Sequence, residues 1–262
     1  MPSLAGRRGS CRYGESIVKT GESACSNLCY HKVKQGGNFM KRTRLCARSL
    51  PAYSVGEETM NTVTHIVGGV AGILVLTFSL ILSIRSRSPW AIVSAAIYGV
   101  SFIQLYALSS VYHGLRAGTA KKVLQVIDHC SIYLFIAGTY TPIVLCSLRP
   151  VHPGWAWTLF GIVWTLAALA ITLTAIDLKK YSKFSMACYI GIGWCVLVAI
   201  KPVLEVMPKA GFTLLLLGGI TYTIGAILYG IGKKRRYMHS LFHIFVLAGS
   251  ILQALCILLY VF

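Results

Sequence analysis

Two histidines, His239 and His243, stand four residues apart at the start of the last apolar stretch of the chain. On a helix, residues four apart share one face, so the two imidazoles would lie one turn from each other. The stretch behind them, residues 246–262, contains no Lys, Arg, Asp or Glu, as is typical of a membrane-spanning helix. Since polar side chains at membrane depth are costly unless something binds them, this pair predicts a metal site.

The composition indicates an integral membrane protein. Of the 262 residues, 56% are hydrophobic, more than a water-soluble domain usually contains. The net charge of +18 would suggest nucleic acid as a partner of a soluble protein. Here the basic residues fall between the apolar runs, as membrane topology requires. We therefore expect contact with membrane lipids and no nucleic-acid partner, and the sequence leaves the oligomeric state open.

The nine cysteines do not predict a disulfide framework. Five of them lie within apolar stretches, where a free cysteine packs as a small apolar residue. Cys25, Cys29 and His31 come closer to the spacing of metal ligands, but no second pair follows nearby. A structural zinc site at this position is therefore disfavoured.

Seven apolar segments predict seven membrane-spanning helices, because each is close to the ~20 residues that cross a bilayer. Their expected ranges are 61–84, 90–115, 123–146, 155–176, 185–206, 212–231 and 239–262. The connections are short, so consecutive helices should be antiparallel neighbours. We predict an all-α bundle of seven transmembrane helices over residues 57–262, with no separate soluble domain.

The N-terminal region, residues 1–56, is basic and lacks the periodicity of a folded element, so we expect it to be disordered. It has no apolar core that would make it a signal peptide. Met40 is followed by Lys-Arg-Thr-Arg, and Gly36-Gly37 lies just upstream, where glycine codons can resemble a ribosome-binding site. We interpret Met40 as an alternative start, in which case residues 1–39 are not translated.

The distribution of charge predicts the orientation of the bundle. The loops after the second, fourth and sixth helices are basic, with Lys121 and Lys122 among their residues, whereas the opposite loops carry few cations. The positive-inside rule then places the N-terminus in the cytoplasm and the C-terminus outside. Trp90, Trp155 and Trp157 should form an aromatic belt at the outer interface.

On this topology the remaining polar residues gather at one depth, near the cytoplasmic face. Of the seven histidines, His31 and His152 fall outside this layer and five belong to it. Its members are Glu57, Glu58, Asn61 and His65 on the first helix, Ser109 and His113 on the second, Asp128 and His129 on the third, and His239 and His243 on the seventh. Independent placement would distribute the histidines between both faces of the membrane.

Each residue of this layer also has a purely structural interpretation. A single histidine near a helix end is usually interfacial, and His129 fits this because it points about 100° away from Asp128 on a helix. Ser109 can bond to the backbone of its own helix. The structural interpretation weakens for His113, His239 and His243 together, since it would require three separate coincidences.

Three neutral imidazoles with one open position are the pattern of a catalytic zinc (Zn²⁺) site, and imidazole also suits iron and nickel. Zinc would lower the pKa of a coordinated water to about 7. We expect Asp128 to hold this water and accept a proton. Ser109 would orient the water or a substrate carbonyl. The hydrogen-bond partners that close the site would be Glu58, Asn61 and His65.

The polar residues of this layer resemble, in their order, the motifs of the hemolysin III family, which belongs with the progestin and adipoQ receptors. The matching motifs are Glu58-x-x-Asn61-x-x-x-His65, Ser109-x-x-x-His113, Asp128 and His239-x-x-x-His243. The resemblance covers about residues 40–262. It implies a multi-pass, seven-helix protein of the bacterial plasma membrane with a cytoplasmic N-terminus. It also implies that zinc is bound by His113, His239 and His243, with Asp128 nearby through water.

Three functions follow as alternatives. Relatives are associated with ceramidase-like hydrolysis, so the resemblance implies a zinc-dependent hydrolase that acts on an amide or ester bond of a membrane lipid. The family name implies cytolytic pore formation, although seven apolar helices without a signal peptide make release in soluble form difficult. A sensor or receptor with structural zinc is the third. A retinal protein is disfavoured, because the seventh helix has no lysine for a Schiff base.

Overall fold

A computed structural model describes residues 43, 45, 48–232 and 235–262 of the chain. Among these residues all regular structure is helical, and seven helical spans are long and apolar enough to cross a membrane. The prediction of an all-α, seven-span membrane bundle is therefore confirmed. The predictions for residues 1–39, the alternative start at Met40 and the Cys25–His31 cluster fall outside the described residues.

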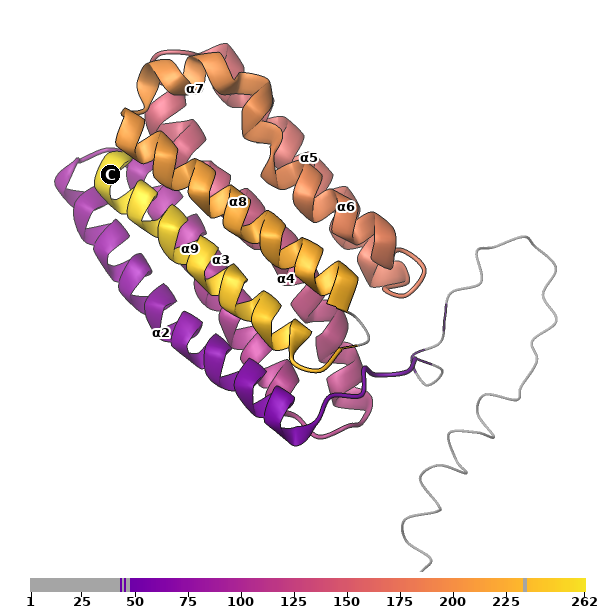
Figure 1. Ribbon diagram of the computed structural model, residues 1–262. Helices are drawn as coiled ribbons and strands as arrows, with labels where there is room; N and C mark the ends of the chain where they lie inside the picture. Colours follow the sequence, from indigo (N-terminus) through magenta and orange to yellow (C-terminus); the bar gives the residue numbers. More distant parts are fainter. Residues whose placement is uncertain (1–42, 44, 46–47, 233–234) are drawn as a thin grey trace, which may run out of the picture. The chain divides into compact units, whose positions relative to one another are not determined.

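The seven spans follow one another in chain order (Figure 1). They are α2 (Val55–Arg85), α3 (Pro89–Gly114), α4 (Thr119–Pro142) with the π-helix η2 (Ile143–Leu148), α5 (Pro153–Ile176), a composite fifth span, α8 (Lys209–Gly232) and α9 (Met238–Tyr260). The fifth span consists of α6 (Ser182–Gly193), the 3-10 helix η3 (Cys195–Ala199) and α7 (Ile200–Val206). Its break is the main departure from the predicted ranges.

The first helix begins at Val55, ahead of the predicted Asn61, because a capping box fixes its N-terminus. The hydroxyl of Ser54 accepts from the backbone N–H of Glu57 at 3.3 Å, and the Glu57 carboxylate accepts from the Ser54 N–H at 2.8 Å. These two bonds satisfy N–H groups that have no partner within the helix. The extra turn adds Glu57 and Glu58 to the end of α2 that carries Asn61.

The helix α2 is polar inside and apolar outside. Asn61, His65 and Gly68 lie on its buried face, whereas Ile66 and Ile73 on the opposite face are exposed. An amphipathic helix of a water-soluble protein has the opposite arrangement. A lipid environment favours polar side chains on the buried face, because hydrocarbon offers them no hydrogen-bond partners.

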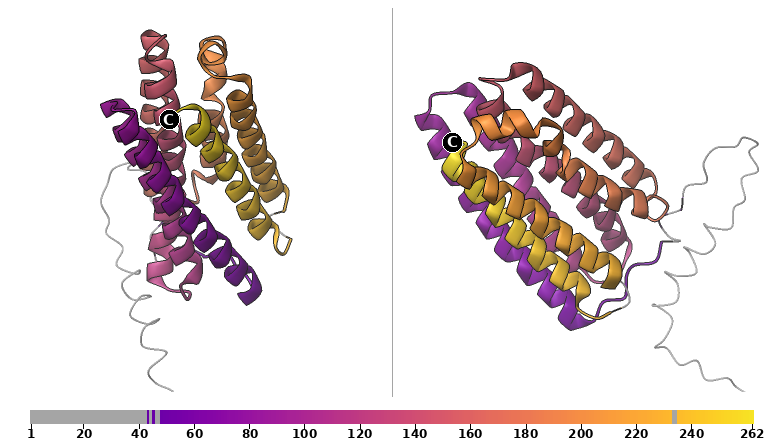
Figure 2. Two further views of the ribbon diagram at one scale, coloured as in Figure 1. Left: turned by 90° about the vertical axis from the view of Figure 1, so that its left-hand side faces the viewer. Right: turned by 45° about the horizontal axis from the view of Figure 1, so that its top comes forward.

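The chain closes on itself through its first and last spans. The helix α2 packs against both α3 and α9, α9 packs against α8, and α4 packs between α3 and α5. Figures 1 and 2 show α2 and α9 side by side, although they are the sequence extremes of the bundle. The N-terminal ends of α2 and α9 are consequently neighbours of the C-terminal end of α3.

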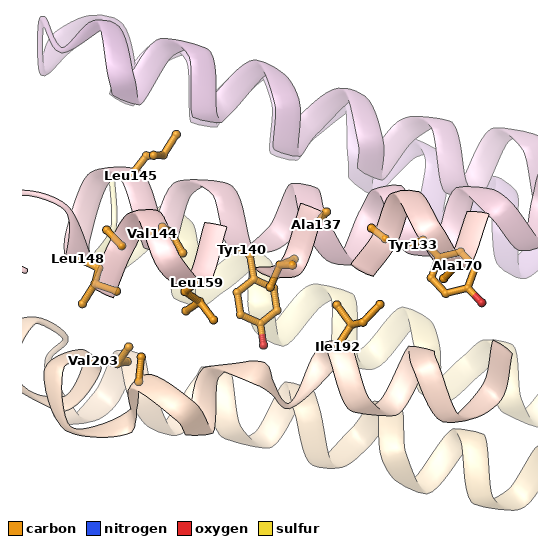
Figure 3. Packing of buried hydrophobic residues seen from close by; sticks show 14 residues of the cluster. Tyr133, Ala137, Tyr140, Val144, Leu145, Leu148, Leu159, Ala170, Ile192 and Val203 are labelled. Atoms are coloured by element: carbon orange, nitrogen blue, oxygen red, sulfur yellow. The ribbon is translucent and has the colours of Figure 1, made fainter. Parts of the chain in front are cut away.

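The break in the fifth span is stabilised from α4. The Tyr140 hydroxyl donates to the backbone carbonyl of Gly193 at 2.7 Å and accepts from the N–H of Val196 at 2.9 Å. Figure 3 shows the Tyr140 ring between α4 and the fifth span, within a buried cluster that also includes Ile192 and Val203. Irregular backbone inside a membrane is tolerated where protein groups satisfy it in this way.

Two glycines allow α2 and α3 to pack closely. A Cβ atom at Gly68 would overlap the ring of Tyr106, and one at Gly72 would lie 2.8 Å from the Phe102 ring. Small residues at such positions are a general device of helix packing in membranes. The same contact places Tyr106 beside His65, with ring centroids 5.3 Å apart.

We expect Gly68→Ala to lower the free energy of unfolding in detergent by about 1–3 kcal/mol, because the added methyl group overpacks the α2–α3 contact. Gly69→Ala is the matched control, since no atom of the described residues lies within 4 Å of its added Cβ. Both changes raise helix propensity equally. Thermal unfolding followed by circular dichroism measures the difference, and equal midpoints for the two variants would contradict this packing.

Candidate metal centre

The polar residues predicted to share one depth converge at one end of the bundle. The beginning of α2 supplies Asn61 and His65, the end of α3 supplies His113, and the beginning of α9 supplies His239 and His243. The opening turns of α4 place Asp128 against Ser109 of α3. The first three spans and the last one therefore build one site.

Three histidines form the centre of this site. The Nε2 atom of His243 lies 2.9 Å from Nε2 of His239 and 3.3 Å from Nε2 of His113. One ring nitrogen from each of the three histidines lies within 4.8 Å of the others. His113 and His243 are buried, and His239 is half-buried. The three imidazoles thus direct nitrogen atoms at a common point.

The hydrogen bonds behind the rings explain which nitrogens face this point. Nδ1 of His113 lies 2.7 Å from the Glu58 carboxylate, which can accept but not donate. The Nδ1 proton is therefore assigned to this bond, and the neutral ring directs an unprotonated Nε2 inward. Nδ1 of His243 lies 2.8 Å from Nε2 of His65, and either imidazole can be the donor of this bond, depending on the tautomer.

This donor set fits a zinc ion. In the tautomers that carry their protons on Nδ1, the Nε2 atoms of His113 and His243 both present lone pairs 3.3 Å apart, which would repel each other unless a cation lay between them. With Zn–N distances of about 2.0–2.1 Å, tetrahedral ligands would be separated by about 3.3 Å. The two separations from His243, 2.9 and 3.3 Å, are close to that requirement, and the ligand atoms of all three histidines lie within 4.8 Å of one another. The cluster can hold a metal ion, as the sequence predicts, and the nitrogen ligands favour zinc.

Asn61 connects the helices that carry the histidines. Its side chain is fully buried, and its carbonyl oxygen accepts from the Ser240 hydroxyl at 2.6 Å. Its amide nitrogen lies 3.3 Å from Nδ1 of His113. Through these contacts one residue of α2 touches both α3 and α9.

Asp128 and Ser109 lie beside the histidines rather than among the converging nitrogens. The Ser109 side chain lies near the buried Asp128 carboxylate, close enough to favour its charged form. His129 donates from Nδ1 to the backbone carbonyl of Gln125 at 2.8 Å and lies 3.6 Å from Asp128. His129 therefore bonds to its own helix as a structural histidine would, but its ring lies within ion-pair distance of Asp128, whereas the helical offset predicts that it points away.

Two residues of the site were not singled out from the sequence. Tyr53, just ahead of α2, stacks on His239 with centroids 4.9 Å apart and planes 10° apart, and burial raises the pKa of its phenol. Lys121 was interpreted as a charge of a cytoplasmic loop. That interpretation is wrong, because Lys121 belongs to α4, is buried and pairs with Glu58 at 2.6 Å. The sequence feature that could have revealed the role of Lys121 was its position next to a helix start, where the helix dipole disfavours a positive charge.

An apolar cavity approaches the histidines from the middle of the bundle. It has a volume of about 130 Å³ and lies between α4, the fifth span, α8 and α9. Phe242 of α9 belongs to its lining. The Phe242 ring centroid lies 5.4 Å from that of His243 and 6.0 Å from that of His239. One aromatic ring therefore separates the cavity from the cluster.

Fold and site together define a multi-pass membrane protein with a buried three-histidine cluster at one end of its helices. The model of the family described as "Haemolysin-III related" matches residues 53–254, and the chain belongs to this family. Hemolysin-3 of Bacillus cereus is 40% identical over 208 residues, which cover 79% of this chain and 93% of that protein.

Further similarities extend this assignment. The Hemolysin-3 homolog of Bacillus subtilis (strain 168) is 39% identical over 208 residues, which cover 79% of this chain and 96% of the relative. An Adiponectin receptor protein of Drosophila melanogaster is 24% identical over an alignment of 279 residues, which covers 90% of this chain and 60% of that protein. The resemblance stated from the motifs and the location in a bacterial membrane are thereby confirmed.

We expect Asn61→Leu to lower the free energy of unfolding by about 1–3 kcal/mol, because the Ser240 hydroxyl would lose its buried acceptor. Thr62→Val is the control, since the Thr62 hydroxyl bonds to the Glu58 carbonyl of its own helix. The control should change stability by less than about 0.5 kcal/mol. Detergent unfolding curves of the two variants test this, and an equal loss in both would show that Asn61 does not join the helices.

Proposed function

We propose that this protein is a zinc-dependent hydrolase that cleaves an amide or ester bond of a membrane lipid. The proposal depends above all on the convergence of Nε2 atoms from His113, His239 and His243, with Nδ1 of two of them held from behind by Glu58 and His65. Three imidazole ligands with an open position are characteristic of catalytic rather than closed structural zinc sites.

The three histidines would hold the ion through their inward-facing nitrogens. When bound, zinc supplies a Lewis acid that polarises a carbonyl and lowers the pKa of water. Glu58 increases the basicity of the His113 ring by accepting a hydrogen bond from its Nδ1–H group, an arrangement that strengthens histidine ligands generally. His65 has the corresponding position behind His243.

Asp128 has the position and chemistry of a general base. Its carboxylate is buried, and His113 and Ser109 are near enough to favour its charged form. In the proposed reaction Asp128 takes a proton from the attacking water and returns it to the leaving amine or alcohol. Ser109 would keep the carboxylate directed at that water. This role is more specific than the one expected from the sequence, in which Ser109 orients the water or a substrate carbonyl.

The apolar cavity supports a lipid as the substrate. Its lining is formed largely by aliphatic and aromatic side chains and reaches Phe242, which contacts two of the histidines. A ligand with a hydrocarbon chain in this cavity would direct its polar end toward the cluster. Pockets of this kind combine an apolar wall with a few polar groups that orient the ligand.

We expect protein purified in detergent without chelators to contain about one zinc ion per chain, because the three nitrogens form a ready ligand set. The double variant His239→Ala/His243→Ala should contain almost none. His152→Ala is the control, since His152 pairs with Glu205 at 2.7 Å, away from the cluster. Mass spectrometry of metal content measures all three proteins, and wild-type protein free of metal would refute the zinc site.

We expect Asp128→Asn to retain zinc but to lose turnover of an amide-linked or ester-linked fluorescent lipid by about 10²–10⁴-fold, the usual contribution of a general base. Asp177→Asn is the matched control, because Asp177 is also a buried carboxylate but caps the turn after α5. Turnover in mixed micelles, with metal content measured on the same samples, tests this expectation.

The same variants separate the alternative functions. A pore-forming protein would release dye from lipid vesicles whether or not Asp128 is intact. A receptor with structural zinc would lose stability in His113→Ala, because bound metal favours the folded state, and would show no lipid turnover. Zinc-containing wild-type protein that shows no lipid turnover would exclude the hydrolase, and dye release or instability of His113→Ala would then distinguish the pore from the receptor.

A further inference from the structure

Lys121 is a buried cation that the proposed reaction does not use. Its ammonium group donates to the Glu58 carboxylate at 2.6 Å, to the Leu115 carbonyl at 2.9 Å and to the His113 carbonyl at 3.3 Å. A lysine ammonium has three protons, so these contacts satisfy it completely. The side chain is also buried, with 5% of the residue exposed.

The location of Lys121 is unfavourable for its own helix. It lies in the first turn of α4, where the helix dipole disfavours positive charge. Burial of a cation adds a desolvation cost of several kcal/mol unless partners offset it. The partners come from other helices, because the ammonium group lies at the C-terminal carbonyls of α3 and beside Glu58 of α2. A lysine that served only membrane orientation would not require this burial.

Glu58 stands between Lys121 and a histidine of the cluster. Its Oε1 atom accepts from Lys121, and its Oε2 atom accepts from Nδ1 of His113 at 2.7 Å. A carboxylate held by an ammonium group on one oxygen has its other oxygen fixed in direction. The fixed oxygen determines both the orientation and the tautomer of the His113 ring, and hence where its Nε2 lone pair points.

We infer that Lys121 is a positioning residue that acts through Glu58 on His113 and thereby sets the zinc affinity of the site. The inference rests on the proposed function, because it concerns the same zinc. Lys121 offsets the charge of Glu58 and keeps the carboxylate behind the His113 ring, where it accepts a hydrogen bond. The Lys121 ammonium group also donates to the backbone carbonyl of His113. Hydrogen bonds therefore fix both the side chain and the main chain of His113.

The test is a double-mutant cycle on zinc affinity, measured by competition with a fluorescent chelator. The proteins are wild type, Lys121→Met, Glu58→Gln and the double variant. We expect each single variant to bind zinc about 10–100-fold more weakly, as loss of a hydrogen-bond partner of a metal ligand usually does. The double variant should bind zinc no more weakly than the single variant with the lower zinc affinity. The reason is that both changes interrupt the same series of contacts, from Lys121 through Glu58 to His113. Lys183→Met, which removes an exposed lysine, should bind as wild type does.

A second measurement separates positioning from a purely structural contact. With cobalt in place of zinc, the visible absorption reports ligand geometry, and we expect Lys121→Met and Glu58→Gln to change it while Lys183→Met does not. Losses that add in the double variant, or a lower melting temperature with wild-type affinity and spectrum, would overturn the inference. Glu58→Gln with wild-type affinity would overturn it even if Lys121→Met fails to fold. Wild-type protein without zinc would instead refute the proposed function, together with this inference.

Discussion

The contact between the first and last spans is the interaction on which the site depends. His65 of α2 bonds to His243 of α9 at 2.8 Å, and Asn61 of α2 accepts from Ser240 of α9 at 2.6 Å. Neither helix could satisfy these polar groups within hydrocarbon alone. Because α2 also packs against α3, the contact brings the two histidines of α9 to His113. Closure of the bundle and assembly of the cluster therefore depend on the same contact between α2 and α9.

The turn before α9 sets the depth at which its histidines enter the site. Tyr237 has a left-handed backbone with φ of 60°, and its N–H donates to the Glu57 carboxylate at 2.7 Å. A non-glycine residue in this conformation requires support from its surroundings. Glu57 gives that support and also caps α2 through Ser54. One carboxylate therefore fixes the start of both helices that flank the cluster.

Sequence reasoning found the spans and the layer because both are properties of single segments. An apolar run of about 20 residues and a histidine pair at helical spacing need no tertiary information. The position of Lys121 next to a helix start can be read from the sequence, but its burial cannot, since that depends on carbonyls of α3 and a carboxylate of α2. The break of the fifth span at Gly193 was equally hidden, because Tyr140 of α4 satisfies its backbone. What the sequence did not reveal were contacts between segments.

The polar and apolar parts of the molecule are joined by a chain of contacts. Tyr222 lines the apolar cavity, and its hydroxyl lies 2.8 Å from that of Ser250. Ser250 accepts in turn from Tyr106 at 2.7 Å, and the Tyr106 ring lies 5.3 Å from that of His65. A molecule in the cavity would touch the first member of this chain, while His65 holds the imidazole of His243. A continuous series of side-chain contacts therefore leads from the lining of the cavity to the imidazole cluster.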